Sequence, residues 1–185
     1  LLCNDNPYSF ILNNDYLSLL GADGAKEIAL ELNSLSKSHN MAGWRIGLVA
    51  GHRDYINTIL KVKSNMDSGM FRALQEAAAE ALGNPDSWYE GLNSVYSSRR
   101  LIVEELMNIL NCRFDPEQTG MFVWGRIPDN TESCEKFVDD ILHRHHVFIT
   151  PGFIFGSGGD RYIRISLCAD EKTLNEAKRR LTSEQ

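Results

Sequence analysis

The sequence predicts an α/β protein in which part of a large domain, with helices flanking a mixed sheet, is followed by a small α+β domain. Strand-like and helical patterns alternate along the first part of the chain, and one long helical stripe occupies its middle. After about residue 111 the pattern changes to short strands and two helices. The chain therefore divides into a partial large domain over residues 1–85, a bridging helix over 86–110 and a small domain over 111–185.

The composition excludes several classes of function. The 19 Lys and Arg residues against 25 Asp and Glu give a net charge of −6, which argues against a nucleic-acid-binding surface. The apolar runs have the length of strands, far short of a membrane span. The 4 cysteines are widely spaced and form no CxxC pair. They are expected to be free thiols of a reducing compartment, which indicates a cytoplasmic protein.

The segment between residues 27 and 50 carries the most distinctive chemistry. Two strands are expected, over Glu27–Asn33 and over Trp44–Ala50, because both runs are rich in residues that favour buried strands. The residues between them are small and polar and include Gly43, a composition typical of an ordered loop. A loop between two buried strands can hold side chains rigidly over one ligand.

This loop places Lys37 after the hydroxyls of Ser34 and Ser36, and Arg45 follows eight positions later. A lysine considered alone is usually a solvated surface charge. Here an arginine and two hydroxyls supply the donors that a phosphate group requires. A lysine that forms an imine beside a phosphate site indicates one cofactor, pyridoxal 5'-phosphate.

The other elements follow from turn residues and periodicity. Leu1–Cys3 is expected to end a strand, Asn4–Tyr8 to form a turn, and residues 11–26 to be irregular surface. Further helices are expected over 53–65, 68–82, 86–110, 131–143 and 170–181, and further strands over 120–127, 147–150 and 161–168.

Three further motifs do not indicate a site. His39 is expected to be a solvated loop residue, because no carboxylate partner is in view. The run His143–His146 lacks the spacing of a metal site on one helix face. The glycines of Gly156–Gly159 lie between two short strands and do not open a helix, so they do not form a dinucleotide-binding loop.

Ser34-Leu35-Ser36-Lys37 and Asn40-Met41-Ala42-Gly43-Trp44-Arg45-Ile46-Gly47 closely resemble the lysine motif of the class I/II aminotransferases. These are fold-type I pyridoxal phosphate enzymes related to aspartate aminotransferase, and the resemblance covers the carboxyl-terminal half of the family's length. Two further matches support it. Asp5 and Tyr8 resemble the pair that contacts the cofactor ring, and Arg164, within Tyr162–Ser166, resembles the arginine that binds the substrate carboxylate.

The resemblance implies a ping-pong transamination between an amino acid and a 2-oxo acid. Lys37 would hold the cofactor as a Schiff base and, once released, would transfer the substrate proton. Asp5 would pair with the ring nitrogen and Tyr8 with the phenolic oxygen. Arg45, Ser34 and Ser36 would anchor the phosphate, and the full-length enzyme would be a homodimer. No membrane or nucleic-acid partner is expected.

Two other functions fit the same residues. The upstream half of the family's site includes a glycine turn, an aromatic ring over the cofactor and an asparagine. In the first alternative, the chain lacks that half and is a catalytically inert fragment. A related pyridoxal phosphate lyase, such as a C–S β-lyase, shares the same motifs. The substrate side chain is not specified, although aspartate-like or diaminopimelate-pathway substrates fit the subgroup that the motifs resemble.

Overall fold

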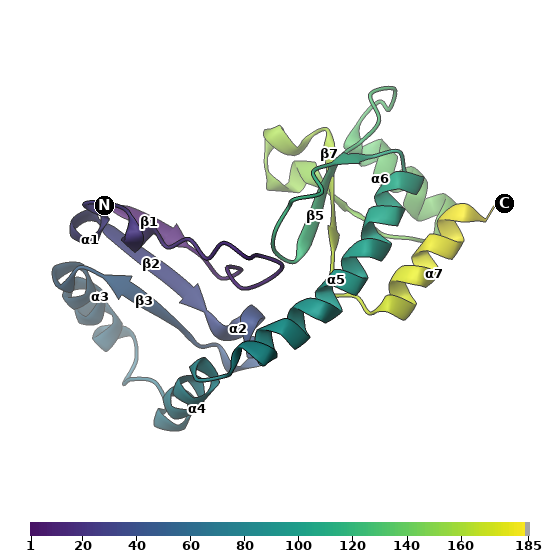
Figure 1. The fold of residues 1–185 in the computed structure, drawn as a ribbon. Coiled ribbons are helices and arrows are strands. Elements are labelled where there is room, and N and C mark those ends of the chain that lie inside the picture. The colour runs from purple at the N-terminus through teal and green to yellow at the C-terminus, as the bar shows by residue number, and fades with distance from the viewer. Residues whose placement is uncertain (184–185) are drawn as a thin grey trace. The chain divides into compact units, whose positions relative to one another are not determined.

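The computed structural model describes residues 1–183 and separates into two compact units, Leu1–Leu92 and Asn93 onward (Figure 1). The long helix α5 (Asp86–Ile109) begins in the first unit and continues into the second. No helix within residues 1–183 is long and apolar enough to cross a bilayer.

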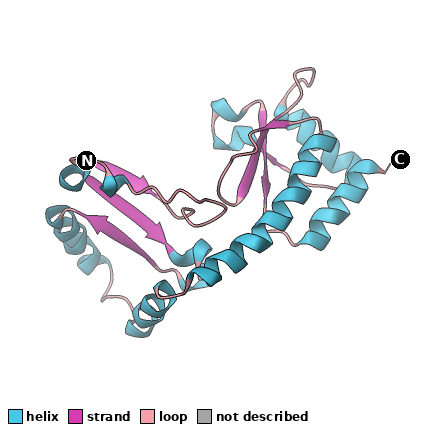
Figure 2. Ribbon diagram, viewed as in Figure 1, coloured by secondary structure: helices cyan, strands magenta, loops and turns pink. Residues whose placement is uncertain are grey.

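The first unit is built on a mixed three-stranded sheet in the order β1 (Leu2–Asp5), β2 (Ala29–Ser34) and β3 (Gly47–Gly51). β1 runs parallel to β2, whereas β3 runs antiparallel to it (Figure 2). β2 begins with the buried residues Ala29 and Leu30 and becomes partly exposed toward Ser34. The central strand therefore emerges from the core at its carboxyl end, where the lysine segment follows.

Helices and single turns complete the first unit. The full helices are α3 (Arg53–Met66) and α4 (Arg72–Leu82), and the short turns are η1 (Leu19–Gly21), α1 (Ala25–Ile28), α2 (Leu35–Ser38) and η2 (Ala42–Trp44). Leu35, Met41 and Ile46 from the lysine segment form a buried cluster with Ala78 of α4. The segment around Lys37 is thus anchored by its own apolar side chains.

The second unit has an antiparallel sheet in the order β4 (Arg113–Phe114), β5 (Phe122–Arg126), β7 (Tyr162–Ser166) and β6 (Thr150–Pro151). Its helices are α6 (Cys134–His145) and α7 (Glu171–Thr182), with the 3₁₀ turns η3 (Gly152–Phe155) and η4 (Ser157–Gly159). Val123 and Ile163 lie on the buried face of the sheet. Gly125, on the same face, allows Met107 of α5 to approach closely.

The predicted α/β class with a mixed sheet is confirmed, as are the helices predicted from residues 53, 86, 131 and 170 onward, with small shifts of their ends. The predicted strands over 120–127 and 161–168 correspond to β5 and β7. The short strand β4 was not predicted.

Several predicted bounds are wrong for identifiable reasons. The strand expected from Glu27 starts at Ala29, because Ala25–Ile28 forms a helical turn. The helix expected from Ser68 starts only at Arg72, since Gly69 has a φ of 102° that a right-handed helix excludes. Of the strand expected over 147–150, only Thr150 is paired, together with Pro151.

The loop expected around Lys37 also needs correction. Its first part is the helical turn α2, and its second part contains the 3₁₀ turn η2. The strand expected from Trp44 starts at Gly47, because Arg45 has a left-handed backbone with φ 52° and ψ 46°. The lysine is therefore carried on a helical turn.

Candidate active site

The residues predicted to bind the cofactor lie along one edge of the first sheet, the edge at which β1 and β2 end and β3 begins. β1 and β2 are parallel, so Asp5 at the end of β1 and Ser34 at the end of β2 reach the same edge. β3 begins at this edge, because Gly47 pairs with Ser34. Arg45 precedes β3 by two residues, and a bond of 3.3 Å from the Leu35 amide to the Ile46 carbonyl joins the two segments. The topology therefore groups Asp5, the lysine turn and Arg45.

Ser34 shapes the turn that carries Lys37. Its side-chain oxygen caps α2 by accepting a bond of 3.2 Å from the Ser36 amide, and its hydroxyl donates to the Ser36 hydroxyl at 2.9 Å. Lys37 is partly buried. Within residues 1–183 its amine makes no hydrogen bond or ion pair, so the amine is available to a ligand.

Arg45 is exposed and adopts a backbone conformation that is uncommon for a residue with a side chain. Its Nη1 donates to the Ala42 carbonyl at 3.0 Å, which fixes the guanidinium over the η2 turn and leaves other N–H donors outward. A positive φ outside glycine costs roughly 1–2 kcal/mol, and such strain gathers at ligand sites. A positive φ also occurs outside glycine at Leu12, Asn40, Asn111 and His146. At Arg45 it therefore accounts for the end of η2 and is not by itself a sign of function.

The residue after Asp5 holds the end of β1 in place. The Asn6 amide donates to the Leu32 carbonyl at 2.9 Å, and Asn33 Nδ2 donates to the Asn6 carbonyl at 2.9 Å. The Asn6 side chain donates to Glu31 at 3.2 Å. Burial acts to raise the pKa of Glu31, but hydrogen bonds from Ser18 and Asn6 outweigh it and lower the pKa overall. Glu31 therefore remains a carboxylate that secures this corner.

Tyr8 lies in the turn that follows β1 and is partly buried. Its carbonyl accepts a bond of 3.0 Å from the amide of Ile11, a fully buried residue. The turn is thus attached to the core by the residue three positions beyond Tyr8.

Ser38 and His39, directly after Lys37, were not predicted as site residues. Ser38 is 1% exposed and His39 is 6% exposed, so the expectation of a solvated His39 is wrong. His39 Nδ1 lies 2.8 Å from Ser38 Oγ, and Nε2 lies 3.0 Å from the Tyr89 hydroxyl. Burial lowers the pKa of His39 below its ordinary value of 6.5. The partners on α5 stand 50 residues away in sequence, which is why no local pattern reveals them.

Arg164 lies in the second unit, on the face of β7 that also carries Tyr162 and Ser166. Its guanidinium carbon sits 4.2 Å from the ring centre of Phe122 and 4.2 Å from that of Phe155. Among residues 1–183, no hydrogen bond or ion pair engages this guanidinium. Two aromatic rings therefore hold the cation by its faces while its N–H donors stay available.

Arg161 has a different setting. Its guanidinium donates to the carbonyls of Thr131 and Pro128, each at 2.6 Å. Its donors are engaged in fixing the loop before α6, so it serves the fold of the second unit.

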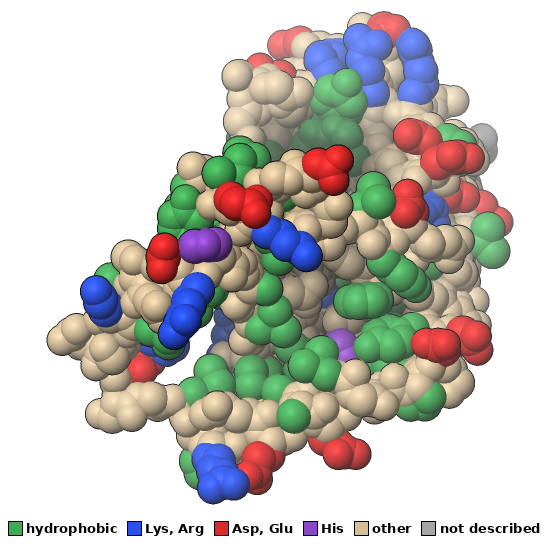
Figure 3. Space-filling model, turned by 60° about the vertical axis from the view of Figure 1, so that its left-hand side comes forward, with side chains coloured by type: hydrophobic (Ala, Val, Ile, Leu, Met, Phe, Trp, Pro, Cys, Tyr) green, Lys and Arg blue, Asp and Glu red, His purple; other side chains and the backbone are tan. Residues whose placement is uncertain are grey.

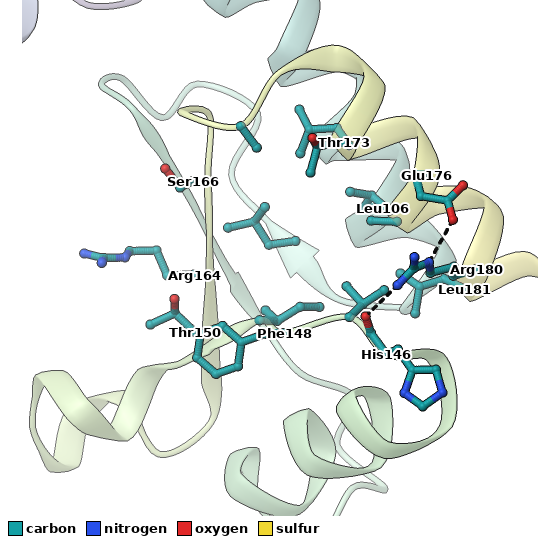
Figure 4. A pocket seen from close by; sticks show the side chains of 16 residues that line it. Leu106, His146, Phe148, Thr150, Arg164, Ser166, Thr173, Glu176, Arg180 and Leu181 are labelled. Carbon is teal, nitrogen blue, oxygen red and sulfur yellow. Dashed lines mark hydrogen bonds and ion pairs between the residues drawn. The ribbon is translucent and has the colours of Figure 1, made fainter.

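A pocket of about 430 Å³ lies beside Arg164 in the second unit (Figure 4). Its lining is mainly aliphatic and comes from β7, α7 and the segment before β6. Arg180 at its far end donates to Glu176 at 2.8 Å and to the His146 carbonyl at 3.0 Å, so these charges are satisfied within the protein. Arg164 points away from that pair (Figure 4).

The donor set at the first sheet edge fits a phosphate-bearing aldehyde. Arg45 and the hydroxyls of Ser34 and Ser36 suit a phosphate, and the available amine of Lys37 suits an aldehyde. No cluster of His, Cys, Asp and Glu in the described part of the chain is arranged to hold a metal ion. An α/β fold with this donor set fits the class of pyridoxal phosphate-dependent enzymes.

Comparison with known proteins identifies the family within that class. The family model "Aminotransferase class I and II" matches residues 6–181, and the chain belongs to this family. Its members are enzymes that depend on pyridoxal 5'-phosphate. The predicted family and cofactor are thereby confirmed.

Two relatives show how much of a family member the chain represents. It is 39% identical to LL-diaminopimelate aminotransferase of Natranaerobius thermophilus over 98% of this chain and 47% of that protein. It is 38% identical to LL-diaminopimelate aminotransferase of Moorella thermoacetica, again over 98% of this chain and 47% of that protein. The chain spans about half the length of the curated relatives it matches.

The solved structures that match are also covered over about half of their length. A probable N-succinyldiaminopimelate aminotransferase from Thermus thermophilus matches with a TM-score of 0.87 at 32% identity, over 97% of this chain and 48% of that one. An aromatic aminotransferase from Pyrococcus horikoshii matches with a TM-score of 0.88 at 30% identity, over 98% of this chain and 50% of that one.

Proposed function

We propose that the chain supplies the lysine-bearing half of a pyridoxal phosphate-dependent aminotransferase that moves an amino group between an amino acid and a 2-oxo acid. The observation that carries this proposal is the grouping of Asp5, Ser34, Ser36, Lys37 and Arg45 at one sheet edge. Family membership supports it independently.

Each residue at this edge has a role in holding the cofactor. Arg45 and the hydroxyls of Ser34 and Ser36 bind the phosphate. The carboxylate of Asp5 stabilises the protonated ring nitrogen, and the hydroxyl of Tyr8 bonds the phenolic oxygen. When bound, pyridoxal phosphate supplies the electron sink that makes the substrate's α-proton acidic.

Lys37 has two tasks in this proposal. Its amine would hold the cofactor covalently. When not engaged with the cofactor, the same amine would act as the base that takes the proton from the substrate α-carbon. With water to release the product oxo acid, and a second 2-oxo acid to take up the amino group, the activity would be a ping-pong transamination.

Arg164 is proposed to bind the α-carboxylate of the substrate. This role rests on the match to the family motif and on the surroundings of the side chain, whose donors are free among the described residues while two rings hold its faces. A bidentate guanidinium would fix the amino acid so that its α-proton is presented to a base.

The relatives guide the choice of substrate. Those with 38–39% identity are named LL-diaminopimelate aminotransferases. We propose a substrate with a second polar or charged group, and LL-diaminopimelate and aspartate are the first amino acids to assay. From the resemblance alone we further propose that the full-length enzyme is a cytoplasmic homodimer.

The test is to add pyridoxal phosphate to the purified chain, reduce it with borohydride and map the modified lysine by peptide mass spectrometry. Lys37 should be modified in the wild type, and the Lys37→Ala variant should lose the visible absorption band that reduction removes. The exposed Lys61 serves as the matched control, since Lys61→Ala should behave like the wild type. Modification spread evenly over the lysines would reject the proposal and favour an inert fragment.

A further inference from the structure

Lys37 is carried by a helical turn that cannot maintain its shape alone. α2 contains only the four residues Leu35–Ser38. A single turn fixes several backbone dihedrals for very few hydrogen bonds, so short helices in isolation are unstable in water. The orientation of Lys37 must therefore depend on contacts between this turn and the rest of the first unit.

Apolar packing of Leu35 anchors the start of the turn, and polar contacts of the two residues that directly follow Lys37 anchor its end. The Ser38 carbonyl accepts a bond of 3.0 Å from the Trp88 indole of α5. The His39 ring lies between two hydroxyls, with Ser38 Oγ at 2.8 Å from Nδ1 and the Tyr89 hydroxyl at 3.0 Å from Nε2. The end of the turn is thus attached to the first turn of α5 at two points.

Tyr89 extends the network toward the turn that carries Tyr8. Its ring meets the edge of His39 at 5.6 Å and stacks on Phe10 at 5.2 Å. Phe10 in turn contacts Tyr16 at 5.0 Å. One chain of rings therefore connects the lysine turn, the start of α5 and the loop between β1 and η1.

We propose that His39 is a positioning residue, which directs the Lys37 amine by joining the end of α2 to the Tyr89 hydroxyl. This inference rests on the proposed function, in which Lys37 is the reactive lysine. An imidazole suits the task because it places polar atoms on two sides of one rigid ring. A proton-transferring group displaced by about 1 Å can lose roughly 100-fold in rate, so such an anchor matters for catalysis.

Two substitutions at His39 separate its contacts. The amide of His39→Gln reaches the position of Nε2 and retains the bond to Tyr89, whereas the amide of His39→Asn occupies the position of Nδ1 and retains only the bond to Ser38. Tyr89→Phe removes the same contact from the other side and keeps the ring stack on Phe10. Exposed His143→Gln and partly buried Tyr55→Phe are the matched controls.

The first measurement is the rate at which borohydride traps pyridoxal phosphate on Lys37 of the full 185-residue chain, relative to Lys61. His39→Asn and Tyr89→Phe should lower the ratio by about tenfold or more, while His39→Gln and both controls stay within about threefold of the wild type. The double variant His39→Asn/Tyr89→Phe should be no slower than either single variant, because both remove one contact.

The second measurement needs no cofactor. The rate of Lys37 acetylation by a small neutral reagent should rise about threefold or more in His39→Asn and Tyr89→Phe, since a released turn exposes its amine. Rates equal to those of the wild type in both variants would overturn the inference, as would a rise shared by every lysine. If the wild type fails to trap the cofactor at Lys37, the proposed function is rejected, and the acetylation rates still decide the role of His39.

Discussion

At the scale of the residue, the positions before and after Lys37 differ in how far the sequence predicts their contacts. Before Lys37, Ser34 and Ser36 can be read from the sequence, because a short hydroxyl before a turn is a common cap. After Lys37, Ser38 and His39 are buried and make their bonds largely to α5. Burial of a polar residue that follows small polar neighbours depends on tertiary contacts, so the sequence could not indicate it.

The burial of His39 predicts that the first unit loses stability in mild acid. Burial lowers the pKa of His39 in the folded chain, so the unfolded chain binds a proton more readily as the pH falls through 6.5. The free energy of unfolding should therefore decrease between about pH 7.5 and about pH 5.5. Urea unfolding followed by circular dichroism at both pH values measures the change.

The matched control for this prediction is His39→Gln, which cannot gain a proton and should show a smaller pH dependence. The groups that face His39 are the hydroxyls of Ser38 and Tyr89, and burial followed by the charge of Asp86 raises the pKa of Tyr89. Neither hydroxyl titrates in this range. An unchanged pH dependence in the variant would show that another group is responsible.

At the scale of the element, periodicity identified the helices well and the short turns poorly. α3, α5 and α7 each repeat apolar residues at helical spacing, and each appears close to the predicted residues. α2 and η2 are too short to establish a period, and β6 is only two residues long. Elements of this length are determined by caps, positive φ values and packing, which leave little signal in the sequence.

The glycines near η4 have an explanation in close packing. A Cβ added at Gly159 would lie 2.0 Å from the carbonyl oxygen of Gly152, whereas one added at Gly158 would meet no atom within 4 Å. These turns therefore need a glycine at one position and tolerate a side chain at the next. At Gly159 the glycine reflects contact between two backbone segments, whereas Gly156 is accounted for by its φ of 119°.

Gly159→Ala should consequently destabilise the second unit by about 1–3 kcal/mol, because backbone atoms must move to admit the methyl group. Gly158→Ala should change stability by less than about 0.5 kcal/mol. Thermal unfolding of both variants measures the difference, and a shift of roughly 4–8 °C is expected for each kcal/mol. Equal midpoints for the two variants would contradict the close approach.

At the scale of the whole molecule, the two units differ in how many large apolar side chains they bury. Large side chains such as Val103, Met107 and Ile163 are fully buried in the second unit. The first unit buries Ile11 and Leu35 as completely, but it has fewer buried large side chains than the second unit, and Met66 and Phe71 are 78% and 70% exposed. Apolar side chains reach the surface at many places on the face seen in Figure 3. The first unit therefore gains less free energy from burial.

Hydrogen exchange should reveal this difference. Amides of β5 and β7 are expected to exchange at least about tenfold more slowly than those of β2, which corresponds to about 1.4 kcal/mol of opening free energy. Mass spectrometry of peptides from the intact chain can compare them in one experiment. Equal protection of β2 and β5 would contradict the prediction.

The fold class and the family could be predicted at this scale because long motifs were present. Ser34–Lys37, Asn40–Gly47 and Tyr162–Ser166 are each continuous in sequence. The division of the structure at residue 92 lies inside α5, which the sequence predicts as one continuous helix. A helix continues through it without a change in pattern, since the division reflects contacts that distant segments make.

The bond from Trp88 to the Ser38 carbonyl has a practical use. It holds an indole fluorophore against Ser38, the residue next to Lys37, with 3.0 Å between the indole nitrogen and the Ser38 carbonyl oxygen. A chromophore bound at that lysine would accept excitation energy from the indole, because such transfer rises steeply at short range. The quenching of intrinsic fluorescence thus gives a label-free optical readout of occupancy, which can be followed in a cuvette during a titration.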